Sequence, residues 1–417
     1  MDFLRTDRSM PHITIVGGGM VGISLALMLS KVFNGYQQTV SVALIEQLAF
    51  PAPPASELAI LPPSFDARST ALSAGSITLL HHVSIWNLLQ EHAEAIKDIH
   101  VSDTGHYGST LLHAETYSVD ALGYVVENRW LGQCLCHQLQ QQKDIQCLSA
   151  STVEQCTFTQ QGPVLSIRQG ESINRLETDL VLIADGANSP LRQSLGIDKV
   201  VTTYQQSAIV TNIAVAKPHK GMAYERFTAQ GPLALLPLAD CDGQHRMSVV
   251  WTRHTDNVGG LMALDNSDFL QELQQCFGFR GGYFIDVGQR YDYPLQLVQA
   301  SEQVRSGLVV VGNAAHFLHP VGGQGFNLSL RDCATLVDVL HQAYQKQQIL
   351  GSYKVLKEYE VQRERDQQLT IGLTDAMVKT FSTQQLSLSI LRQMGFLGLQ
   401  ALPHAKKVLA HQMMGIA

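Results

Sequence analysis

The chain has 417 residues, 45% of them hydrophobic, and carries a formal net charge of −7. This length exceeds one compact core, so two domains are expected, and the acidic balance excludes a nucleic-acid binder held by a basic surface. The seven cysteines are scattered, without a C-x-x-C pair or zinc spacing, which indicates buried thiols in a reducing compartment and no metal site.

The first unit along the chain has the pattern of a dinucleotide-binding turn. Residues 12–16 (HITIV) predict a strand, residues 17–22 (GGGMVG) fit G-x-G-x-x-G, and residues 39–46 (TVSVALIE) predict the next strand. In this context the glycines let the backbone approach a pyrophosphate, and the acid that ends the second strand accepts ribose hydroxyls. The residues expected in these roles are Gly17, Gly19, Gly22 and Glu46. The alternative is a glycine-rich turn that only closes a buried strand–helix unit.

The same region contains 18 uncharged residues, 13–30, which a hydropathy scan would read as a membrane span or a signal peptide. We reject both interpretations. Three adjacent glycines are poor helix interior, and no small-residue cleavage site follows. The strand–turn–helix interpretation explains the segment better.

The middle of the chain predicts one more buried strand and a second sheet. Residues 65–80 are expected to open a helix. Residues 179–197 predict a strand that ends at Asp185-Gly186, followed by a helix starting near Ser189 and Pro190. Residues 204–254 alternate short apolar runs with turns, which indicates an antiparallel sheet in a second domain.

A second glycine-rich stretch lies far from the first, at residues 309–332 (VVVGNAAHFLHPVGGQGFNLSLRD). It predicts a strand that returns to the first sheet, a turn at Gly312-Asn313, and a helix beginning near Phe326. One glycine turn is sufficient for NAD, whereas extended FAD also needs support for its ribityl chain and ring. The late stretch supplies that support, and a helix N-terminus there would stabilise negative charge on a reduced flavin.

Five motifs in order give the chain a family resemblance: GGGMVG with its later Glu, FDARSTALS, VENRWL, LIADGANSPLR and VGNAAHFLHPVGGQGFNLSLRD. Together they resemble the class A FAD-dependent aromatic hydroxylases over roughly residues 11–370. Within that family they are most similar to the ubiquinone-biosynthesis branch, and there to hydroxylases of 2-polyprenyl-6-methoxyphenol. Asn313 stands where the wider family more often has Asp. An amide still bonds a ribityl hydroxyl, and the alternative is that Asn313 weakens FAD retention.

The resemblance implies further cofactor contacts. It places Arg68 and Arg129 near the phosphates or the ribityl chain, and Asp185, Gly186 and Arg192 near the cofactor or its nicotinamide donor. Around the flavin it places Gly312, Asn313, Pro320, Gly322, Gly323, Gly325 and Asn327. The alternatives are that Arg68 and Arg129 are surface arginines and that Arg192 pairs with a carboxylate at the sheet end. His316, His319 and Pro320 are weak catalytic candidates, because the two histidines are also explained as packing residues.

The resemblance also implies an α/β fold with a Rossmann-type FAD domain of the p-hydroxybenzoate-hydroxylase type, an antiparallel-sheet substrate domain and a helical C-terminus. We expect the FAD domain to comprise residues 11–103, 127–199 and 286–345. Residues 104–126 and 200–285 would form the substrate domain, and residues 346–417 the helical region.

The implied activity is hydroxylation of the aromatic ring of a polyprenyl phenol in ubiquinone biosynthesis. NAD(P)H would reduce non-covalent FAD, O₂ would add at flavin C4a to give a hydroperoxide, and the phenol ring would attack its terminal oxygen. NAD(P)H would bind transiently, since no second glycine fingerprint appears. Alternatives are hydroxylation at another ring position or of a soluble aromatic acid, a flavin-dependent C=C reductase, and a flavin-binding scaffold subunit of a biosynthetic complex.

The C-terminal tail differs in charge from the rest of the chain. Residues 376–417 contain four basic residues and no acidic one. Within residues 385–417, apolar side chains recur at helical spacing, so this segment either rests on an anionic membrane or packs on the FAD domain. We therefore expect a cytoplasmic protein, free or docked at the cytoplasmic face of the inner membrane, with ubiquinone-biosynthesis subunits as candidate partners.

Overall fold

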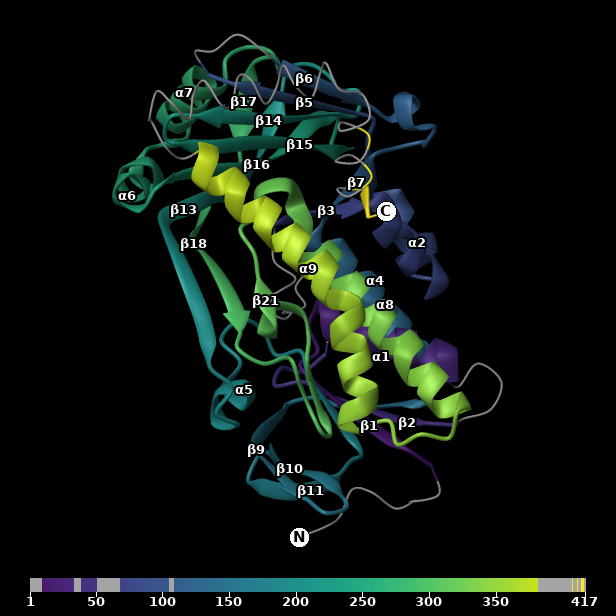
Figure 1. The fold of residues 1–417 in the computed structure, drawn as a ribbon. Helices are drawn as coiled ribbons and strands as arrows, with labels where there is room; N and C mark the ends of the chain where they lie inside the picture. The colour runs from purple at the N-terminus through teal and green to yellow at the C-terminus, as the bar shows by residue number, and fades with distance from the viewer. Residues whose placement is uncertain are drawn as a thin grey trace.

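The computed structural model describes residues 10–33, 39–50, 68–104 and 109–381, together with 407, 411, 414 and 415. Its elements form two large sheets joined by long strands, with helices packed along one side (Figure 1). The mixed fold with a helical C-terminal region confirms the predicted fold class.

The first sheet has six strands and is parallel except at one edge. In spatial order these are β19 (Val304–Arg305), β20 (Leu308–Val310), β12 (Leu180–Ile183), β1 (His12–Val16), β2 (Ser41–Ile45) and β8 (Ile145–Leu148). The late strand β20 pairs in parallel with β12, which in turn pairs with β1. The prediction that the strand at the start of the stretch 309–332 returns to the first sheet is therefore confirmed. These central strands are buried on both faces, as their unbroken apolar runs require.

Helices cover this parallel sheet. The helix α1 (Met20–Phe33) packs against α8 (Gln324–Gln345) and α4 (Asn128–Gln141), and α8 packs against α9 (Tyr353–Phe381). In Figure 1, α9 crosses the molecule diagonally beside α8, from the parallel sheet to the second sheet. The short helix α5 (Pro190–Ser194) follows β12, and the Ser189 side chain caps it by accepting the Arg192 N–H, as the sequence predicted.

The second sheet is larger and mainly antiparallel. Its strands in spatial order are β21 (His316–Phe317), β18 (Tyr291–Ala300), β13 (Lys199–Val215), β16 (Gln244–His254), β15 (Gly231–Cys241), β14 (Met222–Thr228), β5 (Asp98–Asp103) and β6 (Ser109–His113), with β17 (Phe284–Val287) beside β13. The antiparallel sheet predicted for residues 204–254 is thus confirmed, but β5 and β18 also belong to it, although the predicted boundaries assign them to the FAD domain. The division into domains stays a prediction.

Two small antiparallel sheets complete the fold. One contains β9 (Ser151–Thr159), β10 (Gly162–Gln169) and β11 (Ser172–Glu177), and the other contains β3 (Ser69–Ser73), β7 (Gly123–Glu127) and β4 (Ala93–Ile96). The helix expected within 65–80 is α2 (Ala74–His82), which begins only after β3. The helices α6 (Thr255–Ala263) and α7 (Asn266–Phe277) lie at the periphery, and the short helix α3 (Trp86–Leu89) packs Trp86 and Leu89 into the hydrophobic core.

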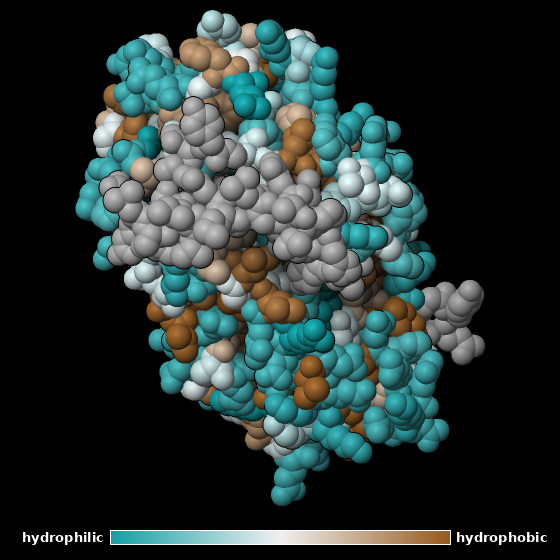
Figure 2. Space-filling view, turned by 45° about the horizontal axis from the view of Figure 1, so that its top comes forward, coloured by the Kyte–Doolittle hydropathy of each residue, from teal (hydrophilic) through white to brown (hydrophobic). Residues whose placement is uncertain are grey.

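On the face shown in Figure 2, the coloured surface is mainly hydrophilic, and its hydrophobic residues form small separate groups. In the part of the chain that the structure describes, no helix combines the length and apolar character needed to cross a membrane.

A buried ionic network fixes α8 and α9 to the second sheet. The Asp332 carboxylate on α8 accepts hydrogen bonds from His316 Nε2 at 2.5 Å, Arg363 Nε at 2.6 Å and Gln367 Nε2 at 3.1 Å. Burial alone would raise the pKa of Asp332, but His316 and Arg363 outweigh burial and hold that pKa below its usual value. Because His316 belongs to β21, this carboxylate joins the sheet to both helices.

The Asp332→Asn variant should be strongly destabilised, since it leaves the buried Arg363 without its full counter-charge. Breaking a buried pair in this way costs about 3–5 kcal/mol. The free energy of unfolding from urea titration measures the effect. Glu154→Gln is the matched control, because Glu154 pairs with Arg168 where both side chains are solvent-exposed, and its effect should stay under about 1 kcal/mol. Equal urea midpoints for the two variants would contradict the assigned role of Asp332.

Candidate active site

The first glycine turn is shaped by backbone contacts that leave no room for side chains. A Cβ on Gly22 would lie 1.8 Å from the Gly17 carbonyl oxygen, and one on Gly17 would lie 2.5 Å from the Ala184 carbonyl oxygen. Gly17 also has φ +110°, which non-glycine residues rarely adopt. The turn therefore brings β1, β12 and the N-terminus of α1 together at one edge of the parallel sheet.

Glu46 lies beside this turn and is held by backbone groups. Its Oε2 accepts the Gly18 N–H at 2.5 Å, and its Oε1 accepts the Leu48 N–H at 2.9 Å. Each carboxylate oxygen can accept a second hydrogen bond. Glu46 is thus orientated at the edge of a cavity with capacity left for ribose hydroxyls.

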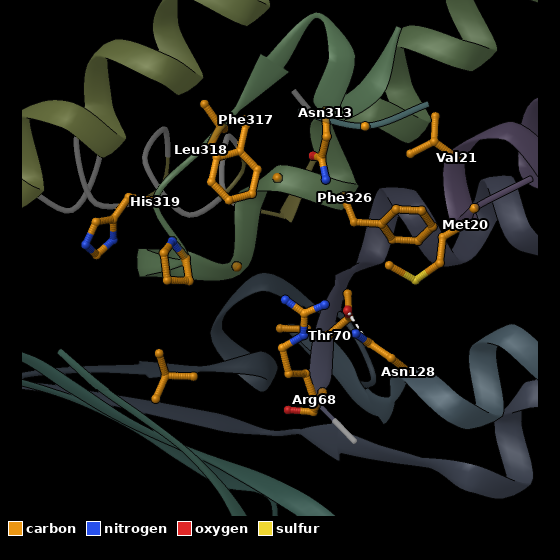
Figure 3. A pocket seen from close by; sticks show the side chains of 18 of the residues that line it. Met20, Val21, Arg68, Thr70, Asn128, Asn313, Phe317, Leu318, His319 and Phe326 are labelled. Carbon is orange, nitrogen blue, oxygen red and sulfur yellow. Dashed lines mark hydrogen bonds between the residues drawn. The ribbon is translucent and has the colours of Figure 1, made fainter. Parts of the chain in front are cut away.

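A cavity of about 1040 Å³ begins at the glycine turn and extends to the second sheet. The predicted residues in its lining are Gly17, Gly19, Glu46, Arg68, Asp185, Gly186, Asn313, His319, Pro320, Gly322, Gly323 and Gly325. In Figure 3, Asn313 and Phe317 point into the cavity from one side, and the guanidinium of Arg68 points in from the opposite side. Segments separated by nearly 300 residues in sequence therefore meet at one site.

The late glycine stretch forms one wall of this cavity. Gly322 and Gly323 have φ values of +71° and +61°, so the turn after Pro320 needs glycine. The helix α8 begins directly afterwards at Gln324, close to the predicted start. A Cβ on Gly325 would meet no atom within 4 Å, so this position is bare toward the cavity, although the fold itself would accept a side chain.

Asp185 supplies an unsatisfied acceptor at the carboxyl end of β12. Its Oδ1 is buried and has no hydrogen-bond partner among the described residues. Burial raises the pKa of Asp185, although Ser189 and Arg192 act in the opposite direction. Next to it, Gly186 leaves open space where a side chain would stand. An orphaned acceptor beside bare backbone fits a ligand that donates hydroxyl hydrogen bonds, such as the ribityl chain of FAD.

Two predicted arginines lie outside the lining of the cavity. Arg129 pairs with Glu127 at 3.2 Å and lies against the ring of Trp130. Arg192 is buried and donates to the carbonyl oxygens of Ala314 at 2.5 Å and Ala187 at 3.0 Å. Through these two bonds Arg192 links the turn after β12 to the turn after β20, so any effect on a cofactor would be indirect.

The remaining predicted glycines, Gly22 and Gly312, and Asn327 do not line the cavity but contact segments that do. Neither Gly22 nor Gly312 is among the lining residues; a Cβ on Gly312 would lie 3.0 Å from the Val21 side chain. Asn327 donates to the carbonyl oxygens of Ala71 and Gly323 and accepts the Ser73 N–H. It therefore joins α8 to β3 beneath the cavity.

The two histidines differ in position. His319 lines the cavity, and burial lowers its pKa to about 3, so its ring is neutral at neutral pH. Its ring meets Tyr204 edge-on at 5.6 Å. His316 lies behind the wall and bonds Asp332. A packing role explains both observations, and the low pKa of His319 keeps its ring from exchanging protons near pH 7.

Sequence reasoning missed the residues that the second sheet contributes. Alternate residues of β5, β6, β14, β15 and β16 line the far end of the cavity, with Glu225 among them. The sequence shows the alternation of apolar and polar residues along a single strand. The pairing that brings five strands to the same cavity depends on tertiary structure. The Thr70–Asn128 hydrogen bond at 2.6 Å, visible in Figure 3, was also not foreseen.

The whole arrangement fits FAD in an extended pose. Glu46 and the first glycine turn would hold the adenosine and pyrophosphate; Asp185, Arg68 and Asn313 would reach the ribityl chain; the wall from Pro320 to Gly325 would face the ring. Within the described residues, no cluster of three His, Cys, Asp or Glu side chains could hold a metal ion.

Comparison with known proteins places this geometry in context. Residues 11–370 match the FAD binding domain family. The chain is 33% identical over 404 residues to ubiquinone hydroxylase UbiL of Rhodospirillum rubrum, covering 97% of this chain and 89% of that protein. It is 31% identical over 397 residues to 3-demethoxyubiquinol 3-hydroxylase of Escherichia coli, covering 93% of this chain and 94% of that protein.

Solved structures confirm the fold. The p-nitrophenol 4-monooxygenase PnpA of Pseudomonas putida superposes with a TM-score of 0.75 over 99% of both chains, at 17% identity. At that identity the similarity concerns the fold alone, and it agrees with the predicted hydroxylase architecture.

Replacing Gly325 should reduce FAD binding without unfolding the protein. A leucine there fits the fold but enters the cavity, and overlap of this kind costs about 1–3 kcal/mol, so FAD affinity should fall roughly 5- to 150-fold. Fluorescence titration of apoprotein with FAD measures this change. Gly372→Leu is the matched control, because Gly372 is also helical and unobstructed but exposed on α9. Equal FAD affinity in both variants would show that the glycine wall does not face the cofactor.

Proposed function

The chain belongs to the FAD binding domain family, and we propose that it is an FAD-dependent aromatic-ring monooxygenase that hydroxylates a polyprenyl phenol in ubiquinone biosynthesis. The observation that carries this proposal is the single cavity that joins the cofactor wall to an apolar sheet face. A phenol bound against that face would lie next to the flavin. The names of the two relatives, both hydroxylases of ubiquinone or its precursors, support this substrate class.

The cofactor performs the oxidation: bound FAD accepts a hydride from NAD(P)H and activates O₂ for transfer to the ring. The protein's residues bind, orientate and shield. Asn313 and Arg68 approach the cavity from opposite walls, so both would contact a ribityl chain that lies between them. Apolar residues such as Phe317, Leu318 and Val250 exclude water, which protects a reactive oxygen species from unproductive decay.

The substrate we propose is 2-polyprenyl-6-methoxyphenol, on the basis of the FDARSTALS, GNAA and GQGFNL motifs. A second candidate is hydroxylation at another ring position, because the name of the Escherichia coli relative specifies position 3 of a demethoxyubiquinol. Both substrates are electron-rich rings with an isoprenoid tail, and the apolar sheet face suits either one.

Turnover assays should separate these candidates. Purified FAD-loaded protein should oxidise NADH or NADPH with matching O₂ uptake and yield hydroxylated product from 2-polyprenyl-6-methoxyphenol. Demethoxyubiquinol and 4-hydroxybenzoate are the comparison substrates, and mass spectrometry identifies the product. Faster turnover of demethoxyubiquinol would favour the second candidate. Absence of substrate-dependent O₂ uptake would instead support a scaffold subunit or a C=C reductase.

We also propose a peripheral membrane contact through residues 385–417, at the cytoplasmic face of the inner membrane, because a polyprenyl substrate resides in the bilayer. Most of this segment lies outside the described residues. Of those described, Lys407 is exposed, whereas Met414 is buried against Ile96, Leu122 and Val125. The segment's end thus packs on the protein, so deleting the tail would test packing as well as membrane binding.

Neutralising charge tests the membrane contact without removing Met414. The triple variant Arg392→Gln, Lys406→Gln, Lys407→Gln should bind anionic liposomes more weakly, since each basic residue near such a surface contributes about 1 kcal/mol. Co-sedimentation at low and high salt measures binding. The matched control replaces three exposed basic residues elsewhere, Lys31, Lys354 and Arg365. An equal loss of liposome binding in both triple variants would rule out a membrane-binding site in residues 385–417.

A further inference from the structure

One face of the second sheet forms the far wall of the cavity and is almost wholly apolar. Side chains alternate along a strand, so residues 223, 225 and 227 of β14 share this face. Glu225 pairs with Val101 on β5 and with Ala234 on β15, and Ala234 pairs with Val250 on β16. All of these residues line the cavity. Glu225 therefore carries a carboxyl group among the apolar residues Val101, Ala223, Phe227, Ala234 and Val250.

Glu225 is half-buried, and one oxygen of its carboxyl group lacks a donor among the described residues. Its Oε1 is buried and has no hydrogen-bond partner among the described residues. Neither Val101 nor Ala234, its neighbours across the two ladders, can donate from a side chain. A buried carboxyl without a donor costs stability. A buried polar atom of this kind needs an explanation, and a ligand that supplies the missing donor is one.

We propose that Glu225 accepts the hydrogen bond of the substrate's phenolic hydroxyl and takes its proton during hydroxylation, which makes it a catalytic base of this enzyme. This inference rests on the proposed function, which supplies the phenol. The cavity supports it, because the sheet face and the cofactor wall border the same space, so a ring that contacts Glu225 can also face the flavin.

The proton transfer is balanced within the substrate and the carboxylate. The phenol O–H bond breaks, its electron pair stays on oxygen, and the proton moves to a Glu225 oxygen. The added electron density makes the ring carbons more nucleophilic toward the oxygen that the bound cofactor supplies from O₂. Attack through the ring carbon converts the phenolate into a neutral dienone. The oxygenated ring carbon then loses its proton to solvent water, which balances the negative charge left on the oxygen donor and restores aromaticity. This step regenerates a phenolate oxygen, to which the protonated Glu225 gives its proton back. Glu225 thus ends as it began.

The ionisation of Glu225 suits this role. Burial raises its pKa to about 7, so it changes charge in the range where a general base works best. Because that pKa lies above its usual value, the carboxylate form predominates only above about pH 7, and acceptance of the phenol proton should become more effective as pH rises through this value.

Other ionisable groups also face the cavity, so the pH dependence is assigned to Glu225 through its variants. The remaining titratable lining residues are Glu46, Arg68, Asp185, Tyr224 and His319. His319 has a pKa of about 3 through burial, and burial raises the pKa of Tyr224 further above its ordinary value. By strand alternation, Asp103 on β5 shares the face of Glu225 beyond Val101, whereas His100 and Arg226 lie on the opposite face, and burial lowers the pKa of His100.

Phenol binding by FAD-loaded protein tests the contact without any turnover. The ligand is 2-allyl-6-methoxyphenol, which stays un-ionised between pH 6 and 8, and equilibrium dialysis gives its dissociation constant. A carboxylate is a stronger acceptor than a carboxylic acid, so affinity in the wild type should rise by about fivefold across this range. Glu225→Gln should abolish the pH dependence, and Glu225→Asp should retain part of it. Glu154→Gln, a surface carboxylate variant on β9, should behave as the wild type.

Turnover provides the second readout. At pH 8, Glu225→Gln should lower kcat/KM for the phenol roughly 100-fold, as for loss of a general base, and its pH profile should lose the rise near pH 7, while FAD content stays unchanged. Glu225→Gln should fold, because it removes a buried unpaired charge. The proposal would be overturned if the affinity and the turnover of Glu225→Gln both kept the pH dependence of the wild type. A wild type that binds the phenol with this pH dependence but never hydroxylates it would overturn the proposed function and support the Glu225 contact.

Discussion

The site depends on one steric constraint, the close approach of the backbone around Gly17. The Ala184 carbonyl oxygen would lie 2.5 Å from a Cβ on Gly17, and the Gly17 carbonyl oxygen would lie 1.8 Å from a Cβ on Gly22. Any larger side chain would separate β1 from β12 or displace α1. Because the strands meet here without side chains between them, the N-terminus of α1, Glu46 and Asp185 all border one cavity, and backbone N–H groups remain available to an anion.

A second constraint fixes the position of the first sheet and its glycine turn relative to the second sheet, which would bind the substrate. The residues from 318 to 323 connect β21, which belongs to the second sheet, with α8, which packs on the first. Both ends of that connection are tied to the same carboxylate, since Asp332 on α8 bonds His316 on β21. The segment that contains Gly322 and Gly323 is therefore anchored at both ends. These anchors fix the position of its backbone, although glycine itself restricts the backbone little. Loss of that carboxylate would loosen the wall as well as the core.

Local patterns predicted the parts of the structure that local physics determines. The G-x-G-x-x-G turn, the strand at 307–313 and the capping of α5 by Ser189 each follow from a few adjacent residues. The contributions of β5 and of β3 were missed, because their residues acquire meaning only through partners more than 50 positions away, such as β14 and β7. The interpretation of Arg192 had a similar limit: an arginine after a sheet-end turn suggests a ligand or a carboxylate partner, whereas here two carbonyl oxygens receive its hydrogen bonds. Sequence identifies the donor, but only the fold identifies the acceptor.

The two ends of the cavity follow different rules for polar groups. At the cofactor end, polar side chains are mostly held by the protein itself, as Glu46 is by two backbone N–H groups, so the cradle is organised before a ligand arrives. At the sheet end, strand alternation selects apolar residues on the buried face, and a valine at position 225 would satisfy both packing and β-propensity. A carboxyl group there departs from every local preference and lowers stability once ionised. Departures of this kind are expected at functional positions, and the apolar neighbours of Glu225 are the reason why its proton affinity falls in a useful range. The exclusion of water thus has two effects. It makes the sheet face suitable for an isoprenoid phenol, and it raises the pKa of Glu225, the group that would accept the phenol's proton.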